Sequence, residues 1–162
     1  MLKKWVLAAA LLLLAAGCGS EKSAPVNGSD SDDEKQKAGG LEVSGEAAPG
    51  EDAVAFTITI ANKGDNESDI EFTSGQKFEI IVTDSAGNEV YRYSDGRMFT
   101  QALETITLKP GESKSWSDEW KTEQAAAGEY EAALTVTASK VDGEEAEPEK
   151  LTVVKMFTLE QP

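Results

Sequence analysis

The stretch from Phe72 to Leu103 constrains the fold most, because it alternates apolar and polar residues as a half-buried β-strand does and then turns twice. Residues 77–83 place three large apolar side chains on one face. After a run of turn-forming residues, residues 89–93 alternate again, with two tyrosines on one face. The pattern predicts a β-hairpin, a second turn over residues 94–97, and then a new apolar segment.

The same alternation recurs on both sides of this hairpin, and no segment has the pattern of a convincing amphipathic helix. Further strands are predicted at residues 54–60, 70–72, 106–108, 116–120, 130–138 and 151–159. Eight or nine short strands separated by Gly, Asn and Pro turns indicate an all-β, two-sheet β-sandwich, with an up-and-down barrel as the alternative. Gly128 and Tyr130 resemble the start of a tyrosine corner, which favours the immunoglobulin-like sandwich.

The N-terminal residues predict export and a lipid anchor. Residues 1–17 contain two lysines, an apolar run and then small residues, which is the layout of a signal peptide. The sequence Ala-Ala-Gly-Cys ending at Cys18 resembles the bacterial lipobox, in which the cysteine carries the acyl chains that hold a protein on a membrane. The alternative is an ordinary signal peptide with Cys18 incidental. The apolar run is too short to span a bilayer and a single cysteine ends it, so we expect the lipoprotein.

Three segments follow from this reading: a lipoprotein signal peptide over residues 1–17, a flexible acidic tether over residues 18–40, and one folded domain over residues 41–162. The tether contains too few apolar residues to offset the entropy that ordering would cost. The expected location is the cell membrane, with the domain tethered on the extracytoplasmic face.

The composition excludes several classes of function. Asp and Glu number 30 against 15 Lys and Arg, so the chain has little means of neutralising phosphates and is not expected to bind nucleic acid. The absence of histidine removes Ser-His and Cys-His catalysis. No pair of carboxylates lies in a context that suggests a glycosidase pocket. We therefore expect a protein that is not an enzyme and that uses no cofactor or metal.

A set of short motifs resembles the BsuPI family, the intracellular proteinase inhibitors and their relatives. The motifs, in order, are SGQxFEI from Ser74, DxxGxxVYRYS from Asp84, FTQAL from Phe99, LKPGE from Leu108, Trp116 and Trp120, and GEY from Gly128. The resemblance covers roughly residues 50–137 and implies an inhibitor that binds a protease, in this setting an extracytoplasmic, subtilisin-like serine protease. The family is named for an intracellular protein, so the export signal is a departure from it.

A loop between two predicted strands is the candidate protease contact, because a substrate-like inhibitor needs an exposed, stiff loop on a scaffold that limits its ordering cost. Arg97 or Met98 could occupy the specificity pocket of the protease. Alternatively, Met98 and Phe99 pack inward and Arg97 pairs with a carboxylate, and we favour this reading because apolar residues at loop ends are usually buried. The candidate contact residues are Ser94, Asp95, Gly96, Arg97, Met98 and Phe99.

Two other groups of side chains could bind a ligand, but each also has a simpler structural explanation. The first is aromatic and could form a binding platform, but strand alternation favours core packing; it comprises Tyr91, Tyr93, Trp116 and Trp120. The second is acidic and could bind a cation, but a charged hairpin tip normally stays solvated; it comprises Glu144, Glu145, Glu147 and Glu149.

Two functions therefore remain open from the sequence. One is a membrane-tethered proteinase inhibitor, as the resemblance implies. The other is a non-inhibitory, immunoglobulin-like module for adhesion or protein interaction at the cell surface, since sandwich folds host many functions.

Overall fold

A computed structural model describes residues 36–38 and 40–160, which form strands joined mostly by short turns. The strands pair antiparallel throughout. In chain order the elements are β1 (Gln36–Ala38), β2 (Leu41–Pro49), β3 (Ala53–Asn62), β4 (Ser68–Phe72), β5 (Phe78–Asp84), β6 (Glu89–Arg92), β7 (Glu104–Leu108), β8 (Ser113–Lys121), β9 (Gly128–Val136), β10 (Lys140–Val141), β11 (Glu144–Glu145), the 3-10 helix η1 (Pro148–Leu151) and β12 (Thr152–Leu159).

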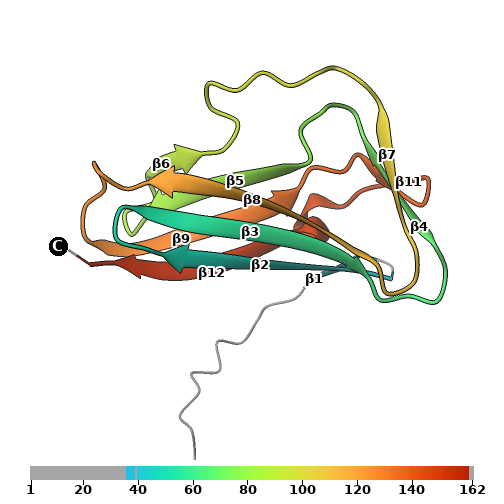
Figure 1. Cartoon of the computed structure of the whole chain (residues 1–162), viewed down its shortest axis with the longest axis horizontal. Helices are drawn as coiled ribbons and strands as arrows, with labels where there is room; N and C mark the ends of the chain where they lie inside the picture. Colours follow the sequence, from blue (N-terminus) through green and yellow to red (C-terminus); the bar gives the residue numbers. More distant parts are fainter. Residues whose placement is uncertain (1–35, 39, 161–162) are drawn as a thin grey trace, which may run out of the picture. The chain divides into compact units, whose positions relative to one another are not determined.

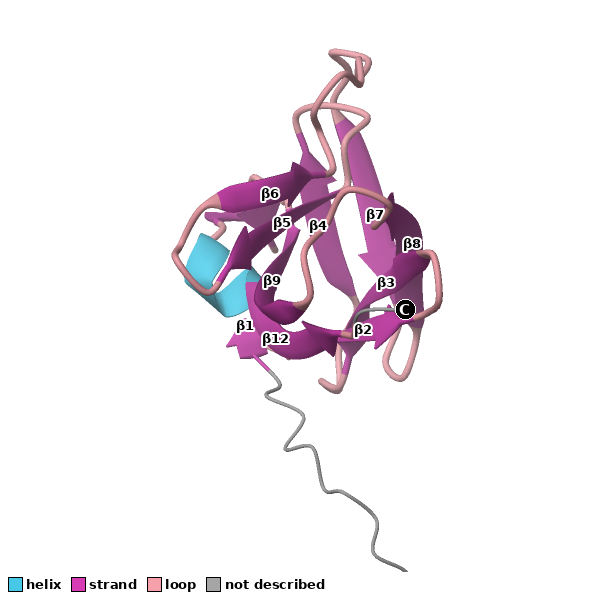
Figure 2. Cartoon of the chain, turned by 90° about the vertical axis from the view of Figure 1, so that its left-hand side faces the viewer, coloured by secondary structure: helices cyan, strands magenta, loops and turns pink. Residues whose placement is uncertain are grey.

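The strands form three sheets rather than the two that were predicted. One sheet has the order β1-β2-β3-β8 and another has the order β12-β9-β5-β6. These two are the layers of the sandwich (Figures 1 and 2). The third sheet, β11-β10-β4-β7, forms because β4 pairs with β7 and β10 instead of joining either layer. The prediction of an all-β sandwich is confirmed, and the number of sheets is corrected.

The core lies between the layers and follows the alternation seen in the sequence. In β3 the side chains at alternate positions are buried from Val54 to Ile60. In β9 the same holds from Tyr130 to Val136. Burying a side chain such as Phe56 contributes about 1.5–3 kcal/mol relative to leaving it exposed, and Phe56 is fully buried. Strand pairing thus places one apolar face of each layer against the other.

A tyrosine corner closes one end of β9. The hydroxyl of Tyr130 donates a hydrogen bond to the carbonyl oxygen of Ala126 at 2.7 Å. This bond to the backbone a few residues upstream is the feature that marks immunoglobulin-like sandwiches. The interpretation of Gly128 and Tyr130 made from the sequence is confirmed.

A buried asparagine joins two turns of the sandwich. The Nδ2 group of Asn62 donates to the carbonyl oxygens of Asn66 at 2.7 Å and of Leu108 at 2.8 Å. Its Oδ1 accepts from the backbone N–H of Gly64 at 2.9 Å. Every polar atom of this buried side chain therefore has a partner, which is the condition under which a buried amide is tolerated.

The N-terminal boundary differs from the prediction in one respect. Residues 36–38, which the composition assigned to the tether, form β1 and pair with β2. The pairing uses backbone groups at the edge of a sheet, so it does not depend on apolar side chains. The predicted signal peptide, Cys18 and residues 18–35 of the tether lie outside the described residues. Within residues 36–38 and 40–160, no helix is long and apolar enough to cross a membrane.

Candidate functional site

The chain between β6 and β7, residues 93–103, is the candidate functional site and is called the 93–103 loop. It leaves one layer of the sandwich and arches across to the third sheet (Figure 1, yellow-green to yellow). It begins with a turn in which the N–H of Arg97 donates to the carbonyl oxygen of Ser94 at 3.1 Å. Gly96 has a φ of 71° in this turn, a value that fits the third position of a type II turn and that only glycine adopts easily.

Aromatic side chains form the floor under the start of the loop. The rings of Phe78 and Tyr93 stack with centroids 4.2 Å apart. The guanidinium of Arg97 lies over the Tyr93 ring, 4.1 Å from its centroid, within the range of a cation–π contact. Phe99 is half-buried against the same tyrosine, with ring centroids 5.9 Å apart. Tyr93 therefore supports two residues of the loop.

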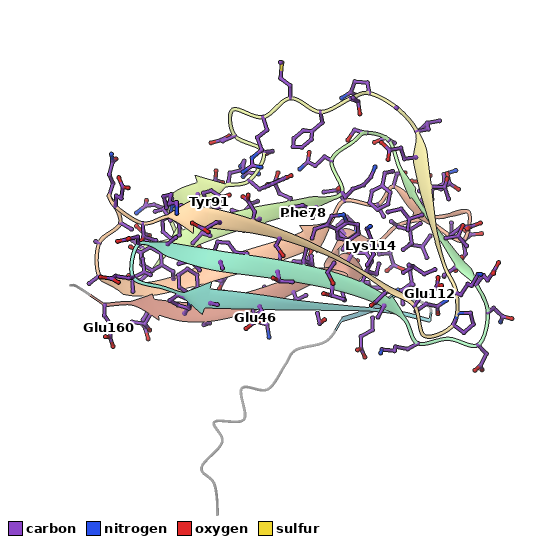
Figure 3. The ribbon with its side chains drawn as sticks, in the orientation of Figure 1. Glu46, Phe78, Tyr91, Glu112, Lys114 and Glu160 are labelled. Atoms are coloured by element: carbon purple, nitrogen blue, oxygen red, sulfur yellow. The ribbon has the colours of Figure 1, made fainter. Side chains whose placement is uncertain are left out.

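A carboxylate on β8 ties the loop to the opposite layer. One guanidinium nitrogen of Arg97 donates to both carboxylate oxygens of Asp118, each at 3.0 Å. The hydroxyl of Tyr91, on β6, donates to the same carboxylate. Asp118 lies on the inner face of β8, and its side chain is only 16% exposed. Figure 3 labels Tyr91, which belongs to this network, and Phe78, which belongs to the aromatic floor.

The charges in this network shift two pKa values upward. Partial burial, the hydrogen bond to Asp118 and the negative charge of that carboxylate raise the pKa of Tyr91 well above its usual range. Partial desolvation opposes the protonated form of Arg97, but the hydrogen bonds and charge of Asp118 outweigh it and raise the pKa of Arg97. Both donors therefore keep their protons throughout the neutral range, so the network persists there.

The first motif of the family resemblance holds the start of the loop. One carboxylate oxygen of Glu79 accepts a hydrogen bond from the backbone N–H of Ser94 at 3.1 Å. The other accepts from the side-chain amide of Gln76 at 3.1 Å, and that amide also donates to the carbonyl oxygen of Phe78. Glu79 and Gln76 thus connect β5 to the turn that begins the loop.

The same motif also holds the middle of the loop. The backbone N–H of Gly75 donates to the carbonyl oxygen of Thr100 at 2.8 Å. A Cβ atom at position 75 would lie 2.6 Å from the hydroxyl oxygen of Thr100, closer than side chains tolerate without moving. Glycine at this position therefore allows the two segments to approach closely.

A lysine links the motif to the far end of the loop. The ammonium of Lys77 forms an ion pair with Glu104, at 2.9 Å, and donates to the carbonyl oxygen of Ser74 at 2.9 Å. It also lies 4.6 Å from the centroid of the Phe72 ring. Glu104 is the first residue of β7, so the 93–103 loop is supported at its start, its middle and its end.

The tip of the loop is exposed, and here one prediction is wrong. Met98 was expected to pack inward, but its side chain is 98% exposed. Beneath the loop, Arg97 and Phe99 both pack on Tyr93, and Met98 does not join them. Leu103, nearer the end of the loop, is 84% exposed. The favoured reading is confirmed for Arg97, which pairs with a carboxylate, and for Phe99, which packs inward.

The aromatic group belongs to the packing of the sandwich. Trp120 is buried and stacks on Tyr91, with ring centroids 5.9 Å apart. Trp116 is partly buried and stacks on Phe78 at 6.3 Å. The prediction that these aromatics pack, rather than form an exposed binding platform, is confirmed.

The acidic residues after β9 form an exposed hairpin. Glu144 and Glu145 make up β11, which pairs with β10 and is an edge strand of the third sheet. Asp142 and Gly143 connect the two strands with positive φ values of 53° and 82°, as a type I′ turn requires. Across the part of the chain that the structure describes, no three His, Cys, Asp or Glu side chains gather as a metal ion would need.

Reasoning from the sequence did not assign the supports of the loop to the site. Gly75, Gln76 and Glu79 appeared only as part of a family motif, and Asp118 was given no role in the site. A carboxylate placed between two inward-facing tryptophans was a usable signal, since a charge on a core-facing position needs a partner.

Comparison with solved structures finds distant similarities. The β-glucosidase from Kluyveromyces marxianus in complex with glucose aligns with a TM-score of 0.40 and 17% identity, over 75% of this chain and 14% of that chain. β-Glucosidase 3B from Thermotoga neapolitana aligns with a TM-score of 0.38 and 14% identity, over 75% and 17%. The yjhA protein from Bacillus subtilis aligns with a TM-score of 0.42 and 15% identity, over 78% and 96%.

The chain thus spans only about 14–17% of the length of these two glucosidases. At these TM-scores none of the structures bears on what the chain does. Among curated proteins, no match was found.

The family comparison is more informative. The model of the family described as BsuPI, intracellular proteinase inhibitor, matches residues 41–141. The matched range includes the 93–103 loop, all the residues that support it and most strands of the two layers. Because this range is more than half of the chain, the protein belongs to the BsuPI family of intracellular proteinase inhibitors.

Proposed function

We propose that the protein is a proteinase inhibitor, held on the extracytoplasmic face of the cell membrane by acyl chains on Cys18, that binds a serine protease of the subtilisin type through the 93–103 loop. The observation that carries the proposal is the combination of firm support and an exposed tip. The loop is bonded at its start, middle and end, while Met98 at its tip is 98% exposed.

Such a loop suits the entry of a protease active site. Binding an unsupported segment would cost roughly 1–2 kcal/mol of backbone entropy for each residue that becomes ordered. The contacts to Asp118, Glu79 and Gly75 already order the loop in the free protein. Most of the interaction energy with a protease would then remain available as affinity.

The location rests on the N-terminal sequence. The family is described as intracellular, but residues 1–17 of this chain read as an export signal that ends at the lipobox cysteine. A flexible coil as long as residues 18–35 would reach on the order of 20–25 Å from the membrane. The target would then be a protease at or outside the membrane surface.

Active-site titration tests the inhibitory function. Residues 19–162, which lack the lipidation cysteine and keep every described residue, are added in increments to subtilisin at a fixed concentration. We expect residual activity to fall in proportion to added protein. An unchanged activity, or cleavage of the added protein with no loss of activity, contradicts inhibition and favours the adhesion or protein-interaction module.

Metabolic labelling tests the anchor separately. A bacterial host that expresses the full chain is grown with labelled palmitate. The wild type should incorporate label and partition with membranes, whereas Cys18→Ala should do neither. Equal labelling of both proteins would contradict the anchor and leave the inhibitory proposal untouched.

A further inference from the structure

We propose that Met98 is the side chain that enters the specificity pocket of the protease, so that the partner is a protease with an apolar pocket rather than one that selects Arg or Lys. This inference rests on the proposed inhibitory function. It follows from a comparison of three adjacent residues at the tip. Arg97, Met98 and Phe99 differ in what they contact, and only Met98 is left free for a partner among them.

Met98 is available for a partner in both its side chain and its backbone. Its side chain is 98% exposed, which is unusual for a residue of this size and apolar character. Within the described part of the chain, Met98 forms no hydrogen bond through its N–H or carbonyl group. Proteins that bind extended peptides do so through the backbone groups and pockets for the side chains. Met98 offers both.

Arg97 is already engaged. It forms two hydrogen bonds with Asp118 and lies over the ring of Tyr93. Moving it into an acidic pocket would leave Asp118, whose side chain is 16% exposed, without its cationic partner. The penalty for unpairing a largely buried carboxylate opposes such a move. Arg97 is therefore a positioning residue, and a protease with a carboxylate in its specificity pocket is a poor partner.

The residues on both sides of Met98 are held by the body of the domain, partly through separate partners and partly through Tyr93. Arg97 is bonded to β8, while Phe99 packs on Tyr93 and Thr100 is bonded to Gly75. If a protease hydrolyses the Met98–Phe99 peptide bond, water adds a hydroxyl to the Met98 carbonyl carbon and a proton to the Phe99 nitrogen. Both new ends then stay in place, so the bond can reform as an intramolecular reaction. Cleavage at this bond would be slow and would not release the protease.

Substitutions at position 98 test the inference directly. Residues 19–162 and their Met98→Leu, Met98→Lys and Met98→Asp variants are titrated against subtilisin, against chymotrypsin, which has an apolar specificity pocket, and against trypsin, whose pocket contains a carboxylate. The wild type and Met98→Leu should inhibit chymotrypsin and not trypsin. Met98→Asp should weaken inhibition by about 30-fold or more, the loss typical of a residue that dominates an interface. Met98→Lys should gain inhibition of trypsin.

A matched control is available at a second exposed methionine, which lies on a strand rather than in the loop. Met156 lies on β12, at the far edge of the sheet from β6, and is 66% exposed. Met156→Asp makes the same chemical change at a second exposed methionine and should leave all three inhibition constants unchanged. Melting temperatures of the position 98 variants should match that of the wild type, because Met98 is 98% exposed in the folded protein.

The outcomes separate the inference from the function on which it rests. Inhibition by the wild type that Met98→Asp does not weaken overturns the inference and leaves the protein an inhibitor with another contact. Inhibition of trypsin by the wild type that is lost in Arg97→Ala also overturns it, since Arg97 would then fill the pocket. If the wild type inhibits none of the three proteases, the proposed function and the inference both fail. Mass spectrometry after long incubation should find a single cut between residues 98 and 99.

Discussion

Removing the carboxylate of Asp118 should loosen the 93–103 loop more than it destabilises the fold. Asp118→Ala deprives Tyr91 of its acceptor and Arg97 of its ion-pair partner. A hydrogen bond to a charged, partly buried group contributes about 1.5–3 kcal/mol. Arg97 is 43% exposed, so its ion pair adds at most about 1 kcal/mol after screening. We expect the free energy of unfolding to fall by about 2–3 kcal/mol.

The effect on inhibition has a different origin. Without Asp118, the turn from Ser94 to Arg97 loses its bond to the opposite layer and becomes mobile in the free protein. Reordering one or two residues on binding costs roughly 1–3 kcal/mol, which corresponds to about a ten- to hundredfold weaker inhibition constant. Glu119→Ala removes a carboxylate from the outer face of the same strand and should change neither quantity by a comparable amount.

The assay combines urea denaturation with inhibition constants for Asp118→Ala, Arg97→Ala and the double variant. The two single changes should be coupled by about 0.5–1 kcal/mol in stability, since the residues contact each other. The reasoning is refuted if Asp118→Ala unfolds more easily but inhibits as tightly as the wild type. In that case the ion pair belongs to the scaffold and does not prepare the loop.

Three further perturbations follow from the structure. Gly75→Ala should displace Thr100, lower the free energy of unfolding by about 1–2 kcal/mol and weaken inhibition. Adding Thr100→Ala should restore both, because it removes the oxygen that the new Cβ would meet at 2.6 Å. Failure of this rescue in thermal melts would contradict the steric reason. Asn62→Ala should lower the free energy of unfolding by about 2–4 kcal/mol, because it leaves the groups bonded by the buried amide without partners; a loss below about 1 kcal/mol in urea denaturation would show that water replaces the amide. Because its pKa is raised in the folded protein, Tyr91 loses its proton at lower pH in the unfolded chain. The stabilisation from the protonated hydroxyl should therefore be fully present below about pH 10, the usual tyrosine value, and should decline as pH rises above it. In Tyr91→Phe that part of the alkaline decline should vanish in melts recorded across pH 8–11.

The strands were predictable because the buried positions follow the alternation of apolar and polar residues along the chain. The apolar positions of β3, β5 and β9 recur every second residue, and a period of two has few other structural meanings. The division into three sheets was not predictable in the same way. Alternation specifies which face of a strand is buried, but it does not specify which strand lies beside it, and β4 could have joined either layer.

The support of the 93–103 loop was hidden for a related reason. Asp118 meets Arg97 only because β8 and β6 lie at facing edges of the two layers, and the spacing of the two residues in the chain carries no sign of this. Met98 was misplaced because a general rule about apolar residues was applied without knowing what occupied the space below. Phe78 and Tyr93 form the floor beneath the loop. Arg97 and Phe99 pack on that floor, and Met98 is left exposed.

Hydrogen exchange in the complex tests most directly whether the 93–103 loop is the surface that binds the protease. Residues 19–162 are mixed with subtilisin whose nucleophilic serine has been replaced by alanine, so that binding proceeds without cleavage. Amide exchange is then compared with that of the free protein. We expect added protection across residues 97–103 and none in β12 or in the acidic hairpin of β10 and β11. Protection of that hairpin, with exchange in the loop unchanged, would contradict this assignment.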